Sequence, residues 1–246
     1  MSQSSRPSLS SRPVVKPSFD PQVQPILPPP VLLHPLPQQA LQPDFITQAF
    51  SRPISWEVEP IFSDAFHIDP EVRKSMIPAA VFFPLVQRPD GLHVMFTRRA
   101  TTLSTHAGQI SFPGGRIEPE DRDAVAAALR ETREEVGIDP SFVHIIGSQP
   151  SFMTATGYTM EPVIGLLKPG FSVRPDETEV AEVFEVPLAF LMDPANHRLH
   201  QANLPDGRQR LYFSMPWGPY FIWGATAALV RNFYRYLSAA HTVSRV

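Results

Sequence analysis

The chain has 246 residues, is 43% hydrophobic and carries a formal net charge of −3 at pH 7. This size fits one domain with extensions or at most two small domains, and the charge gives no global attraction to nucleic acid or anionic lipid. The absence of cysteine excludes disulfides, zinc–thiolate sites and cysteine nucleophiles. Neither an apolar signal-peptide region nor a long apolar span is visible, so we expect a cytoplasmic protein that does not contact membranes.

Residues 1–43 have the composition of a tail. They contain eleven of the 29 prolines and only four charged residues. Proline removes backbone donors, so this composition does not build a helix or a sheet ladder. We predict a disordered, proline-rich tail over residues 1–43 and a globular domain over residues 44–246. The stretch PILPPP at 25–30 either docks into an aromatic groove of an unknown protein partner or, more simply, has no partner.

The globular part contains more predicted strands than helices. A short helix begins near Asp44, which is a candidate N-cap. Apolar runs at 79–86 and 92–99 flank the turn RPDG and predict a hairpin. Further strand candidates are SFVHIIGSQP, MEPVIGLL, RLYFSM and YFIWG, and EVFEVPLAFLM predicts a strand that runs into a short helix at Pro187. The apolar spacing predicts a helix over 225–240. This order indicates an α+β fold with a mixed sheet between helices.

A second helix is predicted over residues 123–136. Asp123 or Asp121 can cap its start, and Gly137 can end it. Glu131, Glu134 and Glu135 cluster on one face, because positions i, i+3 and i+4 are neighbours on a helix. Like charges at this spacing repel, and no lysine is interspersed. The face is either an ordinary charged surface or a site for a hard divalent cation such as Mg²⁺.

A glycine turn precedes this helix, and the two together resemble a known family. The residues Pro113-Gly114-Gly115 allow close approach of the backbone, since glycine has no Cβ. The array Gly115, Asp121, Arg130-Glu131, Glu134-Glu135, Gly137-Ile138 resembles the Nudix box, G-x5-E-x7-R-E-U-x-E-E-x-G-U with U aliphatic. Asp121 replaces the first glutamate, one extra residue lies before Arg130, and Thr132 occupies an aliphatic position.

A longer segment is similar to one branch of that family. The sequence TRRATTLSTHAGQISFPGG (97–115) resembles the coenzyme A diphosphatase signature, L-L-T-x-R-[SA]-x3-R-x3-G-x3-F-P-G-G, except that Ser104 stands where the signature has arginine. Members of the branch also carry the one-residue extension of the box. VFEVPL at 183–188 resembles the branch as well, and the likeness covers roughly residues 75–240.

The resemblance implies a Nudix-type α/β/α sandwich that uses Mg²⁺ or Mn²⁺ on a small-molecule substrate. The implied reaction is hydrolysis of the diphosphate bond of coenzyme A (CoA), or of its thioesters, to adenosine 3′,5′-bisphosphate and 4′-phosphopantetheine. Ser104 leaves open a second substrate class, ADP-ribose or another nucleoside diphosphate derivative. A catalytically silent Nudix module that senses a ligand is a third alternative. The presence of all three glutamates disfavours it.

The resemblance also implies roles for the acidic residues. Glu131, Glu134 and Glu135 are expected to be metal ligands or the catalytic base, with Glu131 and Glu135 as the principal ligands and the Gly115 carbonyl completing the shell. A further base or ligand is expected from a later loop. Of Glu177, Glu179 and Glu182 we favour Glu179, and the alternative for each is a solvated loop position.

The remaining motif positions are expected to shape the site or bind the substrate. Arg130 pairs with a carboxylate, and we assign it, with Asp121, Gly114 and Gly137, to the structural motif. Arg99, Arg98 and His106 are candidates for binding the phosphates of CoA. Alternation along a strand would place one of the two arginines outside the site, and His106 alternatively ties down its loop. Tyr158 either stacks on adenine or belongs to a turn.

Overall fold

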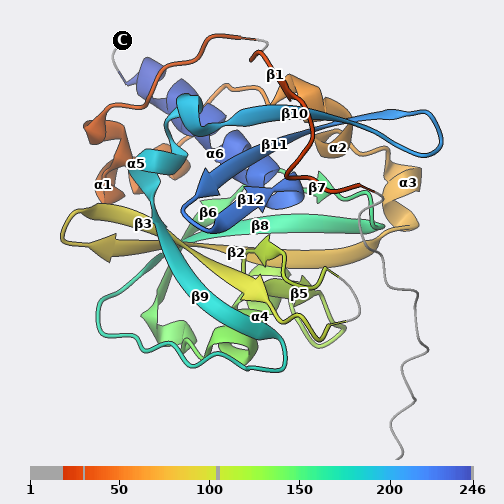
Figure 1. The fold of residues 1–246 in the computed structure, drawn as a ribbon. Coiled ribbons are helices and arrows are strands. Elements are labelled where there is room, and N and C mark those ends of the chain that lie inside the picture. Colours follow the sequence, from red (N-terminus) through yellow and green to blue (C-terminus); the bar gives the residue numbers. More distant parts are fainter. Residues whose placement is uncertain (1–18, 30, 104–105, 245–246) are drawn as a thin grey trace, which may run out of the picture.

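The computed structural model describes residues 19–29, 31–103 and 106–244 of the chain. Within these ranges the centre of the molecule is a mixed sheet of eight strands (Figure 1). β2 pairs in parallel with β8 and antiparallel with β3 and β5, so it is a central strand. The strands of this sheet are β2 (Ile77–Arg88), β3 (Gly91–Arg99), β4 (Ile110–Ser111), β5 (Gly114–Arg116), β6 (Val143–Ser148), β7 (Phe152–Met153), β8 (Tyr158–Leu167) and β9 (Val180–Pro187).

Both faces of β2 are buried, which explains its continuous apolar run. Phe83 lies in the larger core cluster and Phe82 in the smaller one, on the opposite face of the sheet. Arg88 pairs with Gly91 at the turn between β2 and β3. The predicted hairpin is therefore confirmed.

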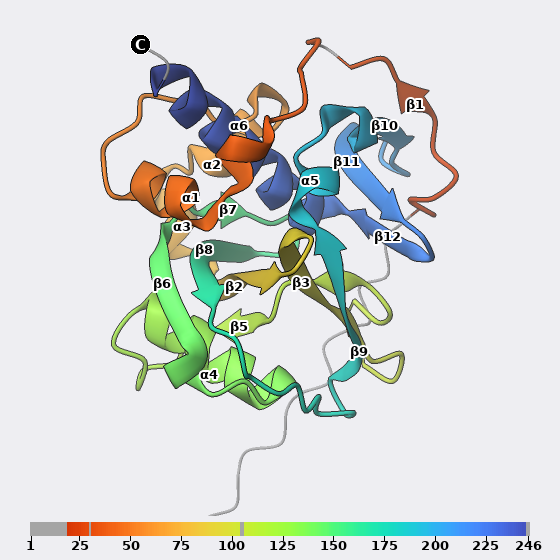
Figure 2. The same ribbon diagram turned by 90° about the vertical axis from the view of Figure 1, so that its left-hand side faces the viewer.

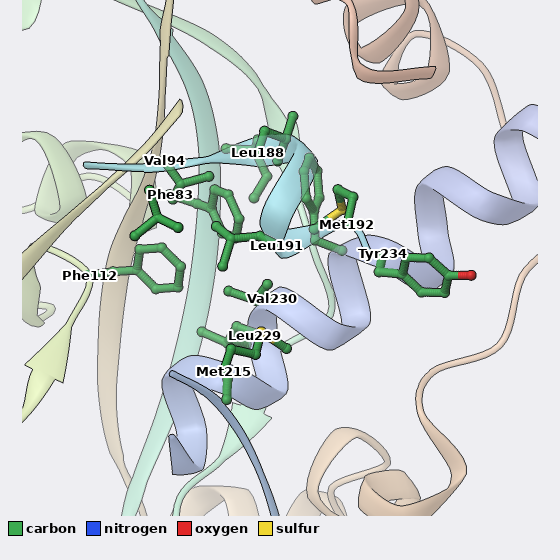
Figure 3. Close-up of a cluster of buried hydrophobic side chains, with 14 of the residues drawn as sticks. Phe83, Val94, Phe112, Leu188, Leu191, Met192, Met215, Leu229, Val230 and Tyr234 are labelled. Carbon is green, nitrogen blue, oxygen red and sulfur yellow. The ribbon is translucent and has the colours of Figure 1, made fainter. Parts of the chain in front are cut away.

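Helices cover both faces of this sheet (Figures 1 and 2). α4 (Ala124–Val136) packs against the smaller cluster, and α6 (Gly224–Val243) packs against the larger one. Figure 3 shows Phe83 and Phe112 in the cluster that also contains Leu229 of α6. The rings of Phe83 and Phe112 are 4.5 Å apart, so the residue before the glycine turn is anchored in the core. The predicted α/β/α arrangement with a mixed sheet is confirmed.

A second sheet of four antiparallel strands lies beside the first within the described residues. Its strands are β1 (Ile26–Leu27), β10 (Arg198–Asn203), β11 (Gln209–Trp217) and β12 (Tyr220–Trp223). The shorter helical elements are η1 (Gln38–Leu41), α1 (Pro43–Phe50), η2 (Pro60–Phe62), α2 (Ser63–Phe66), α3 (Pro70–Lys74), η3 (Pro140–Phe142), α5 (Leu188–Leu191) and η4 (Pro194–Asn196).

The start of α1 differs from the prediction. The helix begins at Pro43 with Gln42 as its N-cap, and Asp44 lies inside the first turn. Proline is favoured at the first helical position, where its missing N–H would have no helical partner.

No helix in the described ranges combines the length and the apolar character needed to cross a membrane.

The N-terminal segment packs against the domain, so the prediction of a disordered tail through residue 43 is wrong for residues 19–29 and 31–43. β1 lies in the proline-rich stretch and pairs with β10 of the same chain. The carbonyl of Pro21 accepts a hydrogen bond from the Tyr212 hydroxyl at 2.6 Å. Proline lacks an N–H but keeps its carbonyl, so a proline-rich segment binds the domain by accepting hydrogen bonds at its carbonyl oxygens. The rest of the predicted tail, residues 1–18 and 30, lies outside the described residues.

A buried ion pair joins the segment before η2 to α6. The Glu59 carboxylate and the Arg231 guanidinium are 2.7 Å apart, and both side chains are 3% exposed. Arg231 also donates a hydrogen bond to Nδ1 of His197 at 3.0 Å, while Nε2 of His197 donates to the Leu191 carbonyl at 2.7 Å. Burial lowers the pKa of His197 to about 3, so the ring is neutral and accepts from Arg231.

Candidate active site

The helix α4 has the predicted caps. The Asp123 carboxylate accepts a hydrogen bond from the Ala126 N–H at 2.8 Å, which makes Asp123 the N-cap. Gly137 ends the helix in the left-handed region, at φ 71°. A Cβ at Gly137 would lie 2.9 Å from the Arg174 carbonyl oxygen, so glycine also permits the close approach of the loop between β8 and β9.

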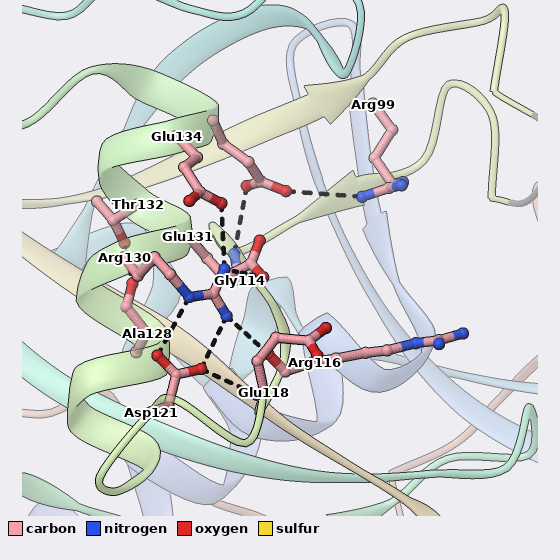
Figure 4. Close-up of polar contacts among 11 residues, drawn as sticks. Arg99, Gly114, Arg116, Glu118, Asp121, Ala128, Arg130, Glu131, Thr132 and Glu134 are labelled. Carbon is pink, nitrogen blue, oxygen red and sulfur yellow. Dashed lines mark hydrogen bonds and ion pairs between the residues drawn. The ribbon is translucent and has the colours of Figure 1, made fainter. Parts of the chain in front are cut away.

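Arg130 connects α4 to the segment that follows the glycine turn (Figure 4). Its Nε and Nη2 donate to the two oxygens of Asp121 at 3.1 and 2.9 Å, and Nη2 also donates to the Arg116 carbonyl at 3.0 Å. Its Nη1 donates to Glu131 at 2.8 Å and to Glu134 at 3.1 Å. The hydrogen bond from Arg130 lowers the pKa of Asp121. Arg130 thus fixes the turn and two glutamates at once.

Glu135 lies at the buried end of the acidic face and is 3% exposed. Its Oε2 accepts a hydrogen bond from the Gly114 N–H at 3.2 Å, and its Oε1 lies 3.8 Å from Nη1 of Arg99. Burial raises the pKa of Glu135 to about 8, against the charge of Arg99 and the Gly114 hydrogen bond and with the help of Glu131 and Glu179. The anionic form therefore lacks sufficient positive charge around it.

This raised pKa predicts that the metal-free protein loses stability as the pH rises from about 5 to about 8. The pKa of this carboxyl in an unfolded chain is about 4.5, so over this pH range the unfolded chain has released a proton that the folded chain still holds. Each added pH unit then favours unfolding. We expect the free energy of unfolding, measured with urea and a chelator, to fall by more than about 1 kcal/mol. Glu135→Gln should flatten this slope, and an unchanged slope would contradict the assignment.

Glu131 lies against the glycine turn. A Cβ at Gly115 would be 2.5 Å from the Glu131 carboxylate, so only glycine leaves this space open. Burial raises the pKa of Glu131, opposed by Arg130 and reinforced by Glu134 and Glu179. Glu134 is the most exposed of the three, with 60% of its side chain accessible. The three predicted ligands therefore occupy different environments along one helix face.

Glu179 reaches the cluster from the loop between β8 and β9. This loop is attached to the last turn of α4, where the Asp176 N–H donates to the Glu135 carbonyl at 3.0 Å. The Glu179 carbonyl in turn accepts a hydrogen bond from the Ala100 N–H at 2.8 Å, next to Arg99. Its carboxylate is near enough to raise the pKa of both Glu131 and Glu135. Of the three glutamates predicted from this region, only Glu179 has this effect on the cluster.

The two neighbouring arginines of β3 point in opposite directions. Arg99 faces Glu135, and its Nε is buried without a hydrogen-bond partner among the described residues. Arg98 forms an ion pair with Glu182 at 2.6 Å, and Glu182 also accepts from the Tyr220 hydroxyl at 2.5 Å. The structure therefore brings Arg99, but not Arg98 or Glu182, to the acidic cluster.

His106 lies in the loop between β3 and β4. Its backbone has φ 56°, in the left-handed region, and its Nδ1 lies 2.8 Å from Oε1 of Gln109. The Gly108 N–H donates to the Arg99 carbonyl at 3.1 Å, so this loop is tied to the strand that carries Arg99. Within the described part of the chain, no hydrogen bond or ion pair joins His106 to the acidic cluster. Ser104 lies outside the described residues.

The oxygen donors of the cluster fit a hard divalent cation. The charges of Glu131 and Glu179 raise the pKa of Glu135, and the charge of Glu179 also raises the pKa of Glu131. A bound cation would remove this repulsion. In the conformations described, no three Asp, Glu or His side chains converge on one point. Instead, Arg130 donates hydrogen bonds to Glu131 and Glu134.

Comparison with known proteins agrees with this arrangement. The family model described as NUDIX domain matches residues 76–205. The uncharacterized Nudix hydrolase NudL of Escherichia coli K12 is 42% identical over 155 residues, which cover 63% of this chain and 79% of the relative. NudL of Cronobacter sakazakii is 41% identical over the same length and the same shares of both chains.

Two solved structures are similar at lower identity. The chain DR0079 from Deinococcus radiodurans is 17% identical, with a TM-score of 0.44 over 69% of this chain and 90% of that one. The NUDIX domain of Shewanella oneidensis NrtR, complexed with ADP ribose, is 19% identical, with a TM-score of 0.39 over 50% of this chain and 80% of that one. Because the family model matches more than half of the chain and NudL matches over most of its own length, the protein belongs to the Nudix hydrolase family.

Proposed function

We propose that this protein hydrolyses the diphosphate bond of CoA or its thioesters, with Mg²⁺ or Mn²⁺, to adenosine 3′,5′-bisphosphate and 4′-phosphopantetheine. The observation that carries the proposal is the junction of the glycine turn and the acidic helix. Gly115 lies against Glu131, and Gly114 donates to Glu135 beside Arg99. The choice of CoA rests on the likeness of residues 97–115 to the coenzyme A diphosphatase signature.

The side chains of this junction supply distinct functions. Glu131 and Glu135, with Glu134 and the Gly115 carbonyl, would hold the cation. When bound, a divalent cation stabilises charge on the diphosphate and lowers the pKa of water. Arg99 neutralises a phosphate oxygen, for which its planar guanidinium is suited.

Water then adds across one P–O bond. One phosphorus gains a hydroxyl group, and the other phosphate leaves with its oxygen. We assign acceptance of the proton from the attacking water to Glu179, which comes from the β8–β9 loop and whose charge raises the pKa of Glu131 and Glu135. A carboxylate so placed acts as a general base when it lies within hydrogen-bond reach of the water.

A substrate panel tests this function. Purified protein is incubated with CoA, acetyl-CoA or ADP-ribose in the presence of Mg²⁺ or Mn²⁺, with EDTA as the control, and products are separated by chromatography. We expect metal-dependent release of adenosine 3′,5′-bisphosphate from CoA or acetyl-CoA. Faster cleavage of ADP-ribose would replace the CoA assignment. Failure of all three substrates with folded protein would favour a ligand-sensing module.

The two glycines of the turn should respond differently to substitution by alanine. In Gly115→Ala the new Cβ meets the flexible end of Glu131, so we expect about a tenfold loss of kcat/KM and less than about 1 kcal/mol of stability. In Gly114→Ala the new Cβ meets the backbone of Ala80 and Val81, so we expect destabilisation by about 2 kcal/mol or more. Urea unfolding and the CoA assay measure both. Equal losses of stability would contradict the distinct roles.

A further inference from the structure

Arg116 is attached to the candidate active site by its backbone. It directly follows Gly115, and its carbonyl accepts the hydrogen bond from Arg130 at 3.0 Å. Its side chain is exposed. Figure 4 shows this side chain extending away from α4, on the same side of the acidic cluster as Arg99. The backbone of Arg116 is therefore fixed by the site, while its guanidinium projects beyond it.

Tyr158 lies beside this guanidinium. The Nη2 of Arg116 donates to the Tyr158 hydroxyl at 3.3 Å, and the guanidinium carbon is 5.9 Å from the ring centroid. The backbone of Tyr158 is held by the turn between β7 and β8, where its N–H donates to the Thr154 hydroxyl at 3.0 Å and its carbonyl accepts from the Thr154 N–H at 2.8 Å. A cationic group and an aromatic ring thus lie side by side where β2 begins, since Arg116 pairs with Ala79 and Tyr158 with Ile77 of that strand.

The charge of Arg116 is not neutralised by the described part of the protein. Arg98, Arg99 and Arg130 each have a carboxylate within 4 Å, whereas no Asp or Glu of the described residues lies within that distance of Arg116. An exposed guanidinium next to a diphosphate site, and without a carboxylate partner, can accept a phosphate with two parallel hydrogen bonds. The adjacent ring offers a surface for a base or sugar.

We infer that Arg116 and Tyr158 form a subsite for a phosphate monoester carried by the nucleoside end of the substrate. In CoA this group is the 3′-phosphate, and the inference rests on the proposed function. Adjacent Cα atoms are only about 3.8 Å apart, so a group held by Arg116 remains within reach of a diphosphate held at Gly115. The subsite would restrict the substrate class to adenosine diphosphate derivatives that carry an additional phosphate.

The test compares CoA with dephospho-CoA, which lacks the 3′-phosphate. We expect wild-type protein to prefer CoA in kcat/KM. Arg116→Gln should lower kcat/KM for CoA by about 10- to 100-fold, the range for loss of charge-assisted hydrogen bonds, mainly through KM. The same variant should leave dephospho-CoA hydrolysis unchanged. Arg208→Gln is the control, because Arg208 pairs with Asp206 in an exposed turn between β10 and β11.

Other outcomes distinguish failure of the subsite proposal from failure of the proposed function. Equal hydrolysis of CoA and dephospho-CoA by the wild type would overturn the subsite and keep the proposed function. Loss of both activities by the same factor in Arg116→Gln would assign Arg116 a structural role and also overturn the subsite. If neither compound is hydrolysed, the proposed function fails. Calorimetric titration then decides: the subsite requires tighter binding of adenosine 3′,5′-bisphosphate than of adenosine 5′-monophosphate, and Arg116→Gln must remove the difference.

Discussion

Glu135→Gln is expected to lower kcat/KM for the diphosphate substrate by about 100-fold or more while leaving the protein folded. Glutamine has nearly the size of glutamate, and its carbonyl oxygen can still accept the Gly114 N–H. The substitution removes the negative charge that would hold the cation beside Arg99. Losses of this order follow when charge stabilisation is removed from a reaction centre.

The measurement is steady-state hydrolysis of CoA, together with circular dichroism and thermal unfolding. Glu71→Gln is the matched control, since Glu71 is exposed and pairs with Lys74 in α3. We expect the control to retain wild-type rates. Because burial penalises the Glu135 anion, the variant should be at least as stable as the wild type at pH 8 in a chelator. Wild-type rates in Glu135→Gln would show that Glu135 is not required for catalysis.

Arg130→Ala is expected to destabilise the protein by about 2–3 kcal/mol. The substitution removes both hydrogen bonds to Asp121, whose side chain is only 6% exposed, and leaves this carboxylate without its cation. Breaking a buried pair typically costs about 3–5 kcal/mol, and we reduce this figure because 30% of the Arg130 side chain is exposed. Glu131 and Glu134 lose their shared partner as well, so activity should also fall.

A double-mutant cycle checks the origin of this loss. The free energy of unfolding is measured by urea for Arg130→Ala, Asp121→Ala and the double variant. We expect the double variant to lose less stability than the sum of the single variants, with a coupling energy above about 1 kcal/mol. Additive losses would show that Arg130 acts through contacts other than Asp121. Arg130→Lys should recover only part of the stability, because lysine does not reproduce the two-pronged contact.

The sequence predicted best those elements whose signals are local. The turn RPDG, the apolar runs around it and the caps Asp123 and Gly137 specify their own structure within a few residues. The strand β10 was not predicted, because its sequence RLHQAN is mostly polar. His200 in this strand is buried by stacking on Tyr212 of the neighbouring strand. That contact arises only after the chain has folded.

Parts of the candidate site depend on long-range geometry that no short motif contains. Alternation along β3 predicts that one of Arg98 and Arg99 leaves the site, but not which one. The choice depends on pairing with β9, where the register shifts between these two residues. Arg116 was not singled out, although its position directly after Gly115 was a usable signal. Its role becomes visible only through Tyr158, which is 42 residues away.

The docking of the first described segment has a consequence for synthesis on the ribosome. The Tyr212 hydroxyl binds the Pro21 carbonyl across 191 residues, and Arg231 binds Glu59 across 172. Such distant contacts close late and slow folding. The segment around Pro21 is therefore synthesised well before the strand that binds it. Until α6 emerges, the nascent chain exposes apolar surface, and it would be a client for chaperones at that stage.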